Sequence, residues 1–292
     1  MLTKSHNLRS ENSTPEASLL LACYNKFEDL DLVFASLEAQ IFKNFEVIIC
    51  DDGSKPEVVE RIRAYMKSSP LAIQHLWHED LGFRKNRMLN QGIRNAKSDY
   101  LIFVDADCVL HPKFIFDHVE HKVAGVVLAG RRVDLTPSIT RALSRDRVRS
   151  GFLQRNFWWI FFAILWMKDN NAPKGIYFNS PFWLRLAHRK ARGIVGCNFS
   201  VHKQDLLAIN GFDMRYEGPG IGEDSDIEFR LRLNGVVIKP FTHKAIQYHL
   251  YHRLLKRASV NDEIFDQVRA SGKSATPFGV AQLMDAEVVP LL

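Results

Sequence analysis

Short apolar runs alternate with amphipathic stretches along the first half of the chain. A strand that is buried on both faces is apolar at every position, so the runs predict buried strands. Apolar residues at helical spacing lie between the runs and predict helices. We therefore expect strands at residues 18–22, 45–50, 71–77 and 100–104, and helices after residue 25 and at residues 57–67 and 84–96.

The first predicted helix has a candidate amino-terminal cap. Asn25 is suited to accept a hydrogen bond from the first turn, and Glu28, three residues later, is suited to bond back. The expected buried face of this helix comprises Leu30, Val33, Phe34, Leu37 and Ile41.

The second half of the chain predicts further strands at residues 125–130, 194–201, 236–239 and 245–248, and helices at residues 203–209 and 223–234. A Gly-rich loop, residues 211–222, precedes the last of these helices. Alternating strands and helices predict an α/β fold in which a mostly parallel central sheet has helices on both faces. In such sheets, ligands bind outside the carboxyl ends of the strands.

The expected domain organisation is a single folded unit. Residues 1–15 are polar and unpatterned and predict a flexible arm, residues 16–255 predict one domain, and residues 256–292 predict a partly helical tail. With 46% hydrophobic residues, the chain has enough apolar side chains for one large core.

The four cysteines predict a reducing environment. Cys23, Cys50, Cys108 and Cys197 lie in or beside apolar runs and form no C-x-x-C pair, so we expect buried free thiols rather than disulfides or zinc ligands. The arm also lacks the apolar core of a signal peptide. Both observations predict a cytoplasmic protein.

The positive charge of the chain is concentrated in one segment. Residues 131–193 carry 13 Lys and Arg but only three acids, whereas the rest of the chain has a net charge of −4. Such a local excess predicts an anionic partner or surface for this basic, aromatic insert.

The insert also contains an apolar run, residues 157–167. This run is too short to cross a bilayer, which needs about 20 residues. Trp158, Trp159, Trp166 and Trp183 all lie in the insert, and Trp together with basic residues is typical of a membrane interface. Two interpretations stay open here: an element at an anionic membrane surface, or a buried helix that covers the sheet.

The strongest candidate for chemistry is the pair Asp105 and Asp107, which follows an apolar strand. Two carboxylates at this spacing after a strand point to the same side and are suited to one hard divalent cation. Such a cation also neutralises charge on a departing diphosphate. The alternative is a solvated turn at the end of the strand.

Two further acidic pairs and one histidine are candidates. Asp51 and Asp52 close the second strand and either bind a base or ribose or form an ordinary Asp-Gly turn. Glu223 and Asp224 start a predicted helix, whose amino terminus either holds a carboxylate ready as a base or is simply capped by it. His249 follows an apolar strand and is either a further metal ligand or structural.

Five motifs occur in the order L-x-A-C-Y-N, F-E-V-I-I-C-D-D-G-S, H-E-D-L-G-F-R-K-N-R, Y-L-I-F-V-D-A-D-C and G-E-D-S-D-I-E-F-R-L. Their joint order resembles the family 2 inverting glycosyltransferases of the GT-A fold. The stretch from G-C-N-F-S-V-H-K through G-F-D to G-E-D-S-D is similar to the galactosyltransferase-type C-terminal motif. Chondroitin-polymerase-like enzymes and animal β-1,4-galactosyltransferases share that motif. The resemblance covers about residues 18–252, interrupted by the insert.

The resemblance implies a reaction. A sugar would pass from a UDP-sugar to an acceptor hydroxyl in a single in-line displacement that inverts the anomeric centre, with Mn²⁺ or Mg²⁺ as the cofactor. The acceptor would be a glycan or a lipid-linked glycan of bacterial polysaccharide, lipopolysaccharide or glycolipid synthesis. The enzyme would work in the cytoplasm, peripherally at the inner face of the plasma membrane.

The resemblance also implies residue roles. Asp107 and His249 would hold the metal, with Asp105 facing the metal or the ribose, and Asp224 would be the general base. The implied donor site comprises Tyr24, Asn25, Asp51, Asp52, Asp80, Arg84, Asn86 and Asp105. The implied acceptor site comprises Gly222, Glu223 and Asn198.

Two other classes of protein compete with this interpretation. One is a catalytically inactive module that binds sugar nucleotides or acts as a scaffold. The other is a basic nucleic-acid-binding protein, suggested by a pI near 9.1. The acidic clusters would repel phosphate, so we expect no nucleic-acid partner. The family's frequent Trp-Gly pair is missing from the loop before Glu223, which leaves the identity of the acceptor open.

Overall fold

The computed structural model describes residues 14–166, 171–218, 222, 224–253 and 260–283, together with the backbone of 289–290. Most of the expected amino-terminal arm lies outside the described residues, as do Glu223 and parts of the carboxyl-terminal tail.

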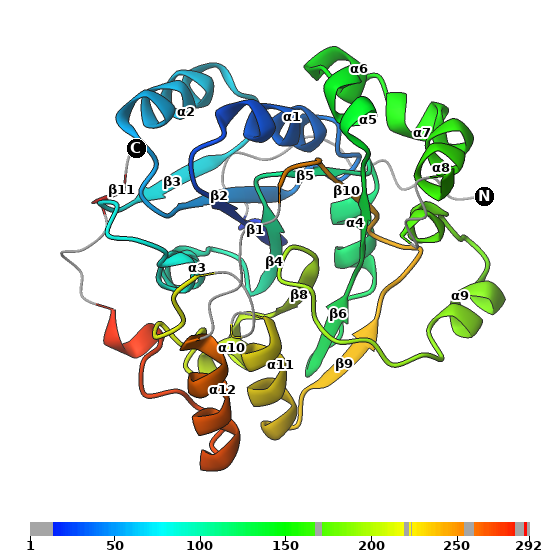
Figure 1. The fold of residues 1–292 in the computed structure, drawn as a ribbon. Coiled ribbons are helices and arrows are strands. Elements are labelled where there is room, and N and C mark those ends of the chain that lie inside the picture. Colours follow the sequence, from blue (N-terminus) through cyan, green and yellow to red (C-terminus); the bar gives the residue numbers. More distant parts are fainter. Residues whose placement is uncertain are drawn as a thin grey trace.

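The centre of the molecule is an eight-stranded sheet in the order β11-β3-β2-β1-β4-β8-β6-β9 (Figure 1). The pairs β1–β2, β1–β4, β2–β3 and β6–β9 are parallel, whereas β8 runs antiparallel to β4 and β6. The strands are β1 (Ala17–Cys23), β2 (Phe45–Asp51), β3 (Ile73–Trp77), β4 (Tyr100–Asp105), β6 (Val126–Ala129), β8 (Phe199–His202), β9 (Val237–Pro240) and β11 (Val289–Pro290).

Helices cover both faces of this sheet, as the alternation of elements predicts (Figure 1). Leu19 and Leu21 of β1 pack in one hydrophobic cluster, and Leu20 and Ala22 pack in another, because alternate side chains of a strand point to opposite faces. The first cluster lies against α1 (Phe27–Glu38), α2 (Pro56–Ser68) and α4 (Phe114–Glu120), and the second against α3 (Lys85–Asn95), α10 (Lys203–Ala208) and α11 (Asp224–Leu233).

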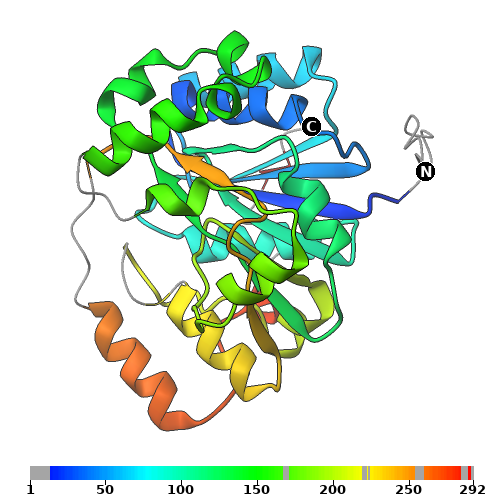
Figure 2. The same cartoon turned by 90° about the vertical axis from the view of Figure 1, so that its right-hand side faces the viewer.

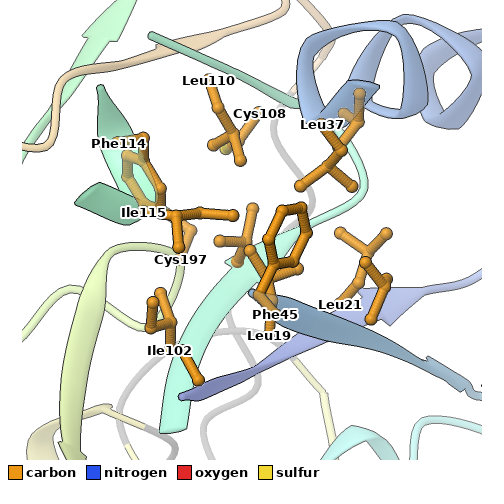
Figure 3. Packing of buried hydrophobic residues seen from close by; sticks show 14 of the residues in the cluster. Leu19, Leu21, Leu37, Phe45, Ile102, Cys108, Leu110, Phe114, Ile115 and Cys197 are labelled. Carbon is orange, nitrogen blue, oxygen red and sulfur yellow. The ribbon is translucent and has the colours of Figure 1, made fainter. Parts of the chain in front are cut away.

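Figure 3 shows the first cluster from close by. Leu19 and Leu21 of β1 and Ile102 of β4 meet Leu37 of α1 and Phe114 of α4. The buried thiols of Cys108 and Cys197 lie in the same cluster. All four cysteines are buried and free, which confirms the expectation.

The tail contains α12 (Val260–Ser271), whose Phe265 meets Phe229 of α11 edge to face.

A second, smaller sheet joins distant parts of the chain. Its central strand, β10 (Gln247–His249), runs antiparallel to β5 (Cys108–Leu110) and parallel to β7 (Arg132–Asp134). The register pairs His249 with Cys108 on one side and with Asp134 on the other. Strands of three residues carry little apolar pattern, so β5 and β7 were not predicted.

The insert folds into short helices: α5 (Pro137–Ala142), α6 (Arg145–Arg149), α7 (Phe152–Arg155), α8 (Phe157–Trp166), the 3₁₀ turn η1 (Ala172–Gly175) and α9 (Pro181–Ala187). Ile160 and Ile164 of α8 enter a third hydrophobic cluster with Val133 of β7 and Tyr248 of β10. Within the described part of the chain, no helix combines the length and the apolar character that crossing a bilayer requires.

Two details of the first helix differ from the prediction. Asn25 is not its cap, because Asn25 and Lys26 both adopt left-handed backbone conformations and α1 begins at Phe27 without a side-chain cap. The Asn25 side chain instead accepts a hydrogen bond from the backbone N–H of Lys55 at 3.1 Å. Ile41 lies beyond the end of the helix and is 53% exposed, so it is not part of the buried face.

Candidate active site

Neighbouring parallel strands bring acidic residues to one rim of the central sheet. Asp51 closes β2 and Asp105 closes β4, and the register pairs them with Cys23 and Ala22 at the end of β1. A cavity of about 410 Å³ opens at this rim. The residues expected in the site that line it are Tyr24, Asn25, Asp52, Asp80, Asp105, Asp107 and His249.

Asp107, His249 and His252 form a cluster at one side of the cavity. Oδ2 of Asp107 lies 3.6 Å from Nε2 of His249 and 3.1 Å from Nε2 of His252. The two imidazole Nε2 atoms are themselves only 3.1 Å apart. Among the residues that the structure describes, this is the group of side chains close enough to share one metal ion. The prediction did not include His252, although the spacing H-x-x-H in the sequence was a signal for it.

The donor atoms of this cluster fit a divalent cation. Imidazole and carboxylate ligands lie about 2.1 Å from such an ion, so neighbouring ligand atoms around it are about 3 Å apart. The separations of 3.1 and 3.6 Å are close to this value. Two neutral imidazoles facing each other cannot both donate a proton, whereas an ion between them would satisfy both lone pairs.

Asp134 supports the cluster from behind. Its Oδ1 lies 3.0 Å from Nδ1 of His249, so that Nε2 of the same ring faces Asp107. Asp134 also pairs with Arg132 at 3.1 Å and accepts a hydrogen bond from the Asn171 side chain. A carboxylate that fixes the orientation of a histidine in this way is the usual second layer of a metal site. Asp134 was not predicted, because its contact with His249 depends on the pairing of β7 with β10.

The electrostatics of the cluster match its geometry. Burial alone would raise the pKa of Asp107, but hydrogen bonds and charge from His249 and His252 hold that pKa well below its usual range. Burial lowers the pKa of His249, but Asp107 and Asp134 outweigh it and raise the value to about 9. The hydrogen bond with Asp107 likewise raises the pKa of His252.

Asp105 takes a different partner. It pairs with Nζ of Lys85 at 2.8 Å, and both residues line the cavity. Asp105 is not part of the cluster that could share an ion, so the geometry does not favour a metal-binding role for it. Lys85 was not predicted, although it lies between the predicted residues Arg84 and Asn86.

Asp52 and Asp80 also line the cavity. Asp52 accepts hydrogen bonds from the backbone N–H of Arg84 and faces His78, both at 2.8 Å. Asp80 accepts a hydrogen bond from the Tyr24 hydroxyl at 3.0 Å. The turn at Gly53 brings the two segments together, since a Cβ there would lie 2.6 Å from Cα of Asp80 and the backbone φ is +89°.

Both carboxylate oxygens of Asp51 have partners within the protein. It is completely buried, its Oδ1 accepts a hydrogen bond from the backbone N–H of Ser54 at 2.8 Å, and its Oδ2 lies 2.9 Å from Nε2 of His75. Of the two adjacent acids, therefore, Asp52 lines the cavity and Asp51 holds the turn.

Three other predicted site residues are not among the residues that line the cavity. The Asn86 amide donates to the backbone carbonyl of Asp213 at 2.8 Å, and the Arg84 guanidinium donates to that of Glu79 at 2.6 Å. Asn198 is completely buried, and its amide donates to the carbonyls of Arg131 and Ala245. These hydrogen bonds tie the three side chains to the scaffold, and the roles of Arg84 and Asn86 in the donor site and of Asn198 in the acceptor site stay predictions.

Asp224 and Gly222 do not line the cavity. Asp224 is the first residue of α11, and its Oδ1 accepts a hydrogen bond from the backbone N–H of Ser225 at 2.8 Å. Gly222 has a φ of +128°, and a Cβ there would lie 2.1 Å from the Tyr216 ring. Gly222 thus has a packing role in the structure, rather than the exposed position that contact with an acceptor would need.

Solved structures share the fold. TarS of S. aureus, residues 1–349 in complex with UDP-GlcNAc, matches with a TM-score of 0.54 at 18% identity and covers 88% of this chain and 65% of that one. The mannosyltransferase PcManGT from Pyrobaculum calidifontis, in complex with GDP-Man and Mn²⁺, matches with a TM-score of 0.53 at 15% identity, over 87% and 61%. Both are glycosyltransferases of the GT-A type, so the predicted fold is confirmed.

Curated relatives agree in sequence. Validoxylamine A glucosyltransferase of Streptomyces hygroscopicus subsp. jinggangensis is 25% identical over 236 residues, which is 76% of this chain and 52% of that enzyme. Chondroitin synthase of Escherichia coli is 25% identical over 251 residues, which is 80% of this chain and 34% of that enzyme. The chain thus spans about half or less of the length of these relatives.

Two family models match consecutive parts of the chain. The model described as N-terminal domain of galactosyltransferase matches residues 186–253, the part that contains β10 and His252. The model described as Glycosyl transferase family 2 matches residues 18–178, more than half of the chain. The match to Glycosyl transferase family 2 covers the strands that form the rim and both aspartates of the D-x-D pair, Asp105 and Asp107. The chain therefore belongs to glycosyl transferase family 2.

Proposed function

We propose that the protein transfers a sugar from a UDP-sugar to an acceptor hydroxyl, with inversion of the anomeric centre and with Mn²⁺ or Mg²⁺ as the cofactor. The observation that carries the proposal is one cavity in which the cluster of Asp107, His249 and His252 faces Asp52 and Asp80. A metal-binding side and a hydrogen-bonding side are what a nucleotide diphosphate needs. The UDP-GlcNAc and Mn²⁺ complexes of the structural neighbours support the choice of ligands.

The donor is held mainly by side chains of the cavity. Asp52 and Asp80 accept hydrogen bonds from the base and the ribose, and Tyr24 and Asn25 cover them from the end of β1. Asp107, His249 and His252 would hold the ion, which when bound neutralises charge on the departing diphosphate. Lys85, beside Asp105, adds a positive charge to the same wall of the cavity.

Asp224 is the proposed general base for the acceptor hydroxyl. It begins α11, and the amino terminus of a helix stabilises a carboxylate in its charged form, the form that accepts a proton. Glu223, which precedes it, is the proposed contact for the acceptor. In-line attack by the activated hydroxyl, opposite the leaving diphosphate, inverts the anomeric centre.

The proposed acceptor is a glycan or a lipid-linked glycan of bacterial polysaccharide, lipopolysaccharide or glycolipid synthesis. Chondroitin synthase of E. coli and the poly-beta-1,6-N-acetyl-D-glucosamine synthase of Staphylococcus aureus, 31% identical over 107 residues, support a role in glycan assembly. The proposed location is the cytoplasm, at the inner face of the plasma membrane.

Hydrolysis of a panel of UDP-sugars, with and without Mn²⁺, tests this function. We expect Mn²⁺-dependent release of UDP, and a loss of at least about a hundredfold in Asp107→Asn. Asp262→Asn makes the same chemical change on the exposed side of α12 and is the matched control. An inactive module would bind UDP without releasing it from any donor, with or without an acceptor, and that result would refute the proposal.

A further inference from the structure

Helix α8 is apolar at every position but is only partly buried. Its sequence, FWWIFFAILW, contains no polar side chain. A helix that is apolar on all sides is normally covered on all sides. Here Ile160 and Ile164 are buried, whereas Trp158, Phe162 and Trp166 are 64%, 61% and 89% exposed. The side of α8 away from the core is therefore left uncovered by the residues that the structure describes.

A second exposed aromatic pair lies on the same side of the molecule. Phe182 and Trp183 of α9 contact each other edge to face and are both exposed. Helices α8 and α9 both lie at the right-hand edge of Figure 1, so Figure 2 looks onto them. We define the aromatic face as Trp158, Trp159, Phe162 and Trp166 of α8 with Phe182 and Trp183 of α9. Several large exposed aromatic side chains on one side of a molecule indicate an interaction site.

The segment that contains α9 is basic. Residues 171–193, which contain α9, carry five Lys and Arg and no acid. Arg185, Arg189 and Lys190 are exposed on and directly after α9, and Arg155 is exposed just before α8. Indole rings bordered by cations suit the headgroup region of a bilayer that contains anionic lipid.

We propose that the aromatic face docks the protein onto an anionic phospholipid bilayer. A helix of ten residues is about 15 Å long, half the thickness of the hydrocarbon core, so α8 lies in the interface rather than across the membrane. The tryptophans enter the headgroup layer, and Arg185 of α9 meets lipid phosphates together with Arg189 and Lys190, which follow it.

A series of direct contacts links α8, which carries most of the aromatic face, to the candidate active site. Gly175 of η1 lies between α8 and β7, since a Cβ there would be 3.1 Å from the Phe157 ring and 3.2 Å from Val133. Val133 precedes Asp134, which holds His249, and Asn171 donates a hydrogen bond to Asp134. Docking through α8 would therefore be transmitted by direct packing to the residue that orients His249. A further step rests on the proposed function: docking onto a bilayer favours an acceptor glycan that carries a lipid anchor.

Cosedimentation of the full chain with phosphatidylcholine vesicles, with and without phosphatidylglycerol, tests the docking surface. We expect binding only to the anionic vesicles, weakened by high salt, with a blue shift of tryptophan emission. Trp158→Ser combined with Trp166→Ser should reduce binding roughly tenfold. Ile41→Ser combined with Val123→Ser changes two exposed apolar residues outside the insert and should leave binding unchanged.

The charge contribution has its own matched pair of variants. Arg185→Gln with Arg189→Gln should weaken binding to anionic vesicles, whereas Arg63→Gln with Lys67→Gln, on the exposed side of α2, should not. Equal binding of the wild type and the Trp158/Trp166 variant would overturn the proposal. A second outcome would also overturn it. In that outcome, light scattering shows that the wild type is a dimer and the Trp158/Trp166 variant a monomer, and both bind vesicles equally weakly.

The two proposals fail separately. Asp107→Asn should sediment with anionic vesicles like the wild type, because Asp107 is not part of the aromatic face. The Trp158/Trp166 variant should hydrolyse a soluble UDP-sugar like the wild type. Loss of vesicle binding in Asp107→Asn would contradict the assignment of docking to the aromatic face. Loss of hydrolysis in Asp107→Asn, with vesicle binding intact, concerns only the proposed sugar-transfer site.

Discussion

Asp134 lies 3.0 Å from Nδ1 of His249 and thereby points Nε2 of the ring at Asp107. The two residues meet because β7 and β10 pair in parallel with Asp134 opposite His249. We predict that Asp134→Asn weakens Mn²⁺ binding by about 10- to 100-fold, since an amide orients the imidazole less firmly and does not increase its basicity. Titration with Mn²⁺ measures the effect. The control is Asp146→Asn, an exposed change in α6, which should bind Mn²⁺ like the wild type. Equal Mn²⁺ affinity in the wild type and both variants would refute the role of Asp134 in positioning His249.

The affinity for the metal should rise with pH. Burial lowers the pKa of His249, but Asp107 and Asp134 raise it to about 9, so the metal-free ring is protonated at neutral pH. A metal must displace this proton, and the affinity should therefore increase by up to about tenfold per pH unit until pH reaches about 9. Mn²⁺ titrations between about pH 6.5 and 8.5 test this. His249→Gln should bind more weakly and with a flatter pH dependence.

The same raised pKa predicts the opposite trend for the stability of the metal-free protein. A group whose pKa is raised by folding contributes its full stabilisation below its unfolded pKa, about 6.5 for histidine. That contribution is lost as pH rises from there through about 9. Urea unfolding in the presence of a chelator should show a free energy of unfolding that falls over this range, less so in His249→Gln. If the free energy of unfolding instead rose with pH, and did so less in His249→Gln, the raised pKa of His249 would be contradicted.

Gly53 offers a test of the close approach between the two donor-binding segments. Gly53→Ala adds a Cβ 2.6 Å from Cα of Asp80 at a φ of +89°, so we expect a loss of about 1–3 kcal/mol in the free energy of unfolding and weaker UDP binding. Gly235→Ala is the control, because its φ is +80° but nothing lies within 4 Å of the added Cβ. The difference between the two variants isolates the contact with Asp80. Equal losses, with UDP binding intact, would show that the contact is unimportant.

The buried ion pair of α11 should matter more than the exposed one on the same helix. Arg230 bonds to Asp226 and to the carbonyls of Ile209 and Gly211, and both charged side chains are 1% exposed. Arg230→Met leaves Asp226 buried without its cation, so we expect a loss of about 3–5 kcal/mol in urea unfolding. Arg232→Met removes the exposed pair with Glu228 and should cost less than about 1 kcal/mol. Similar losses in both variants would contradict this reasoning.

Local patterns predicted the parts of the fold that depend on continuous apolar runs. The strands ending at Asp51 and Asp105, and the helices between them, follow from the burial of both faces of the sheet. Asp107 and His249 were predicted together only through the joint order of the motifs. Which of Asp51 and Asp52 faces the cavity was not predictable, because a turn at Gly53 decides it.

The rest of the site depends on contacts between distant segments. His252 and Asp134 acquire their places from the pairing of β5, β7 and β10. Of these strands, β5 and β7 carry too little apolar pattern to detect. Asn198 was assigned by resemblance alone, yet its amide bonds to two backbone carbonyls in the core. The cap at Asn25 failed because a left-handed backbone at Asn25 and Lys26 turns the chain before α1 begins.

The three-stranded sheet makes the candidate metal site a junction between the two halves of the polypeptide. Asp107 and Asp134 come from the first half, and His249 and His252 come from the second. An ion bound there ties β10 to the segment that follows β4, so it should bind the native state and not the unfolded chain. Binding of the ion would then add to the free energy of unfolding, so the metal-loaded protein should resist urea and proteases better than the metal-free protein.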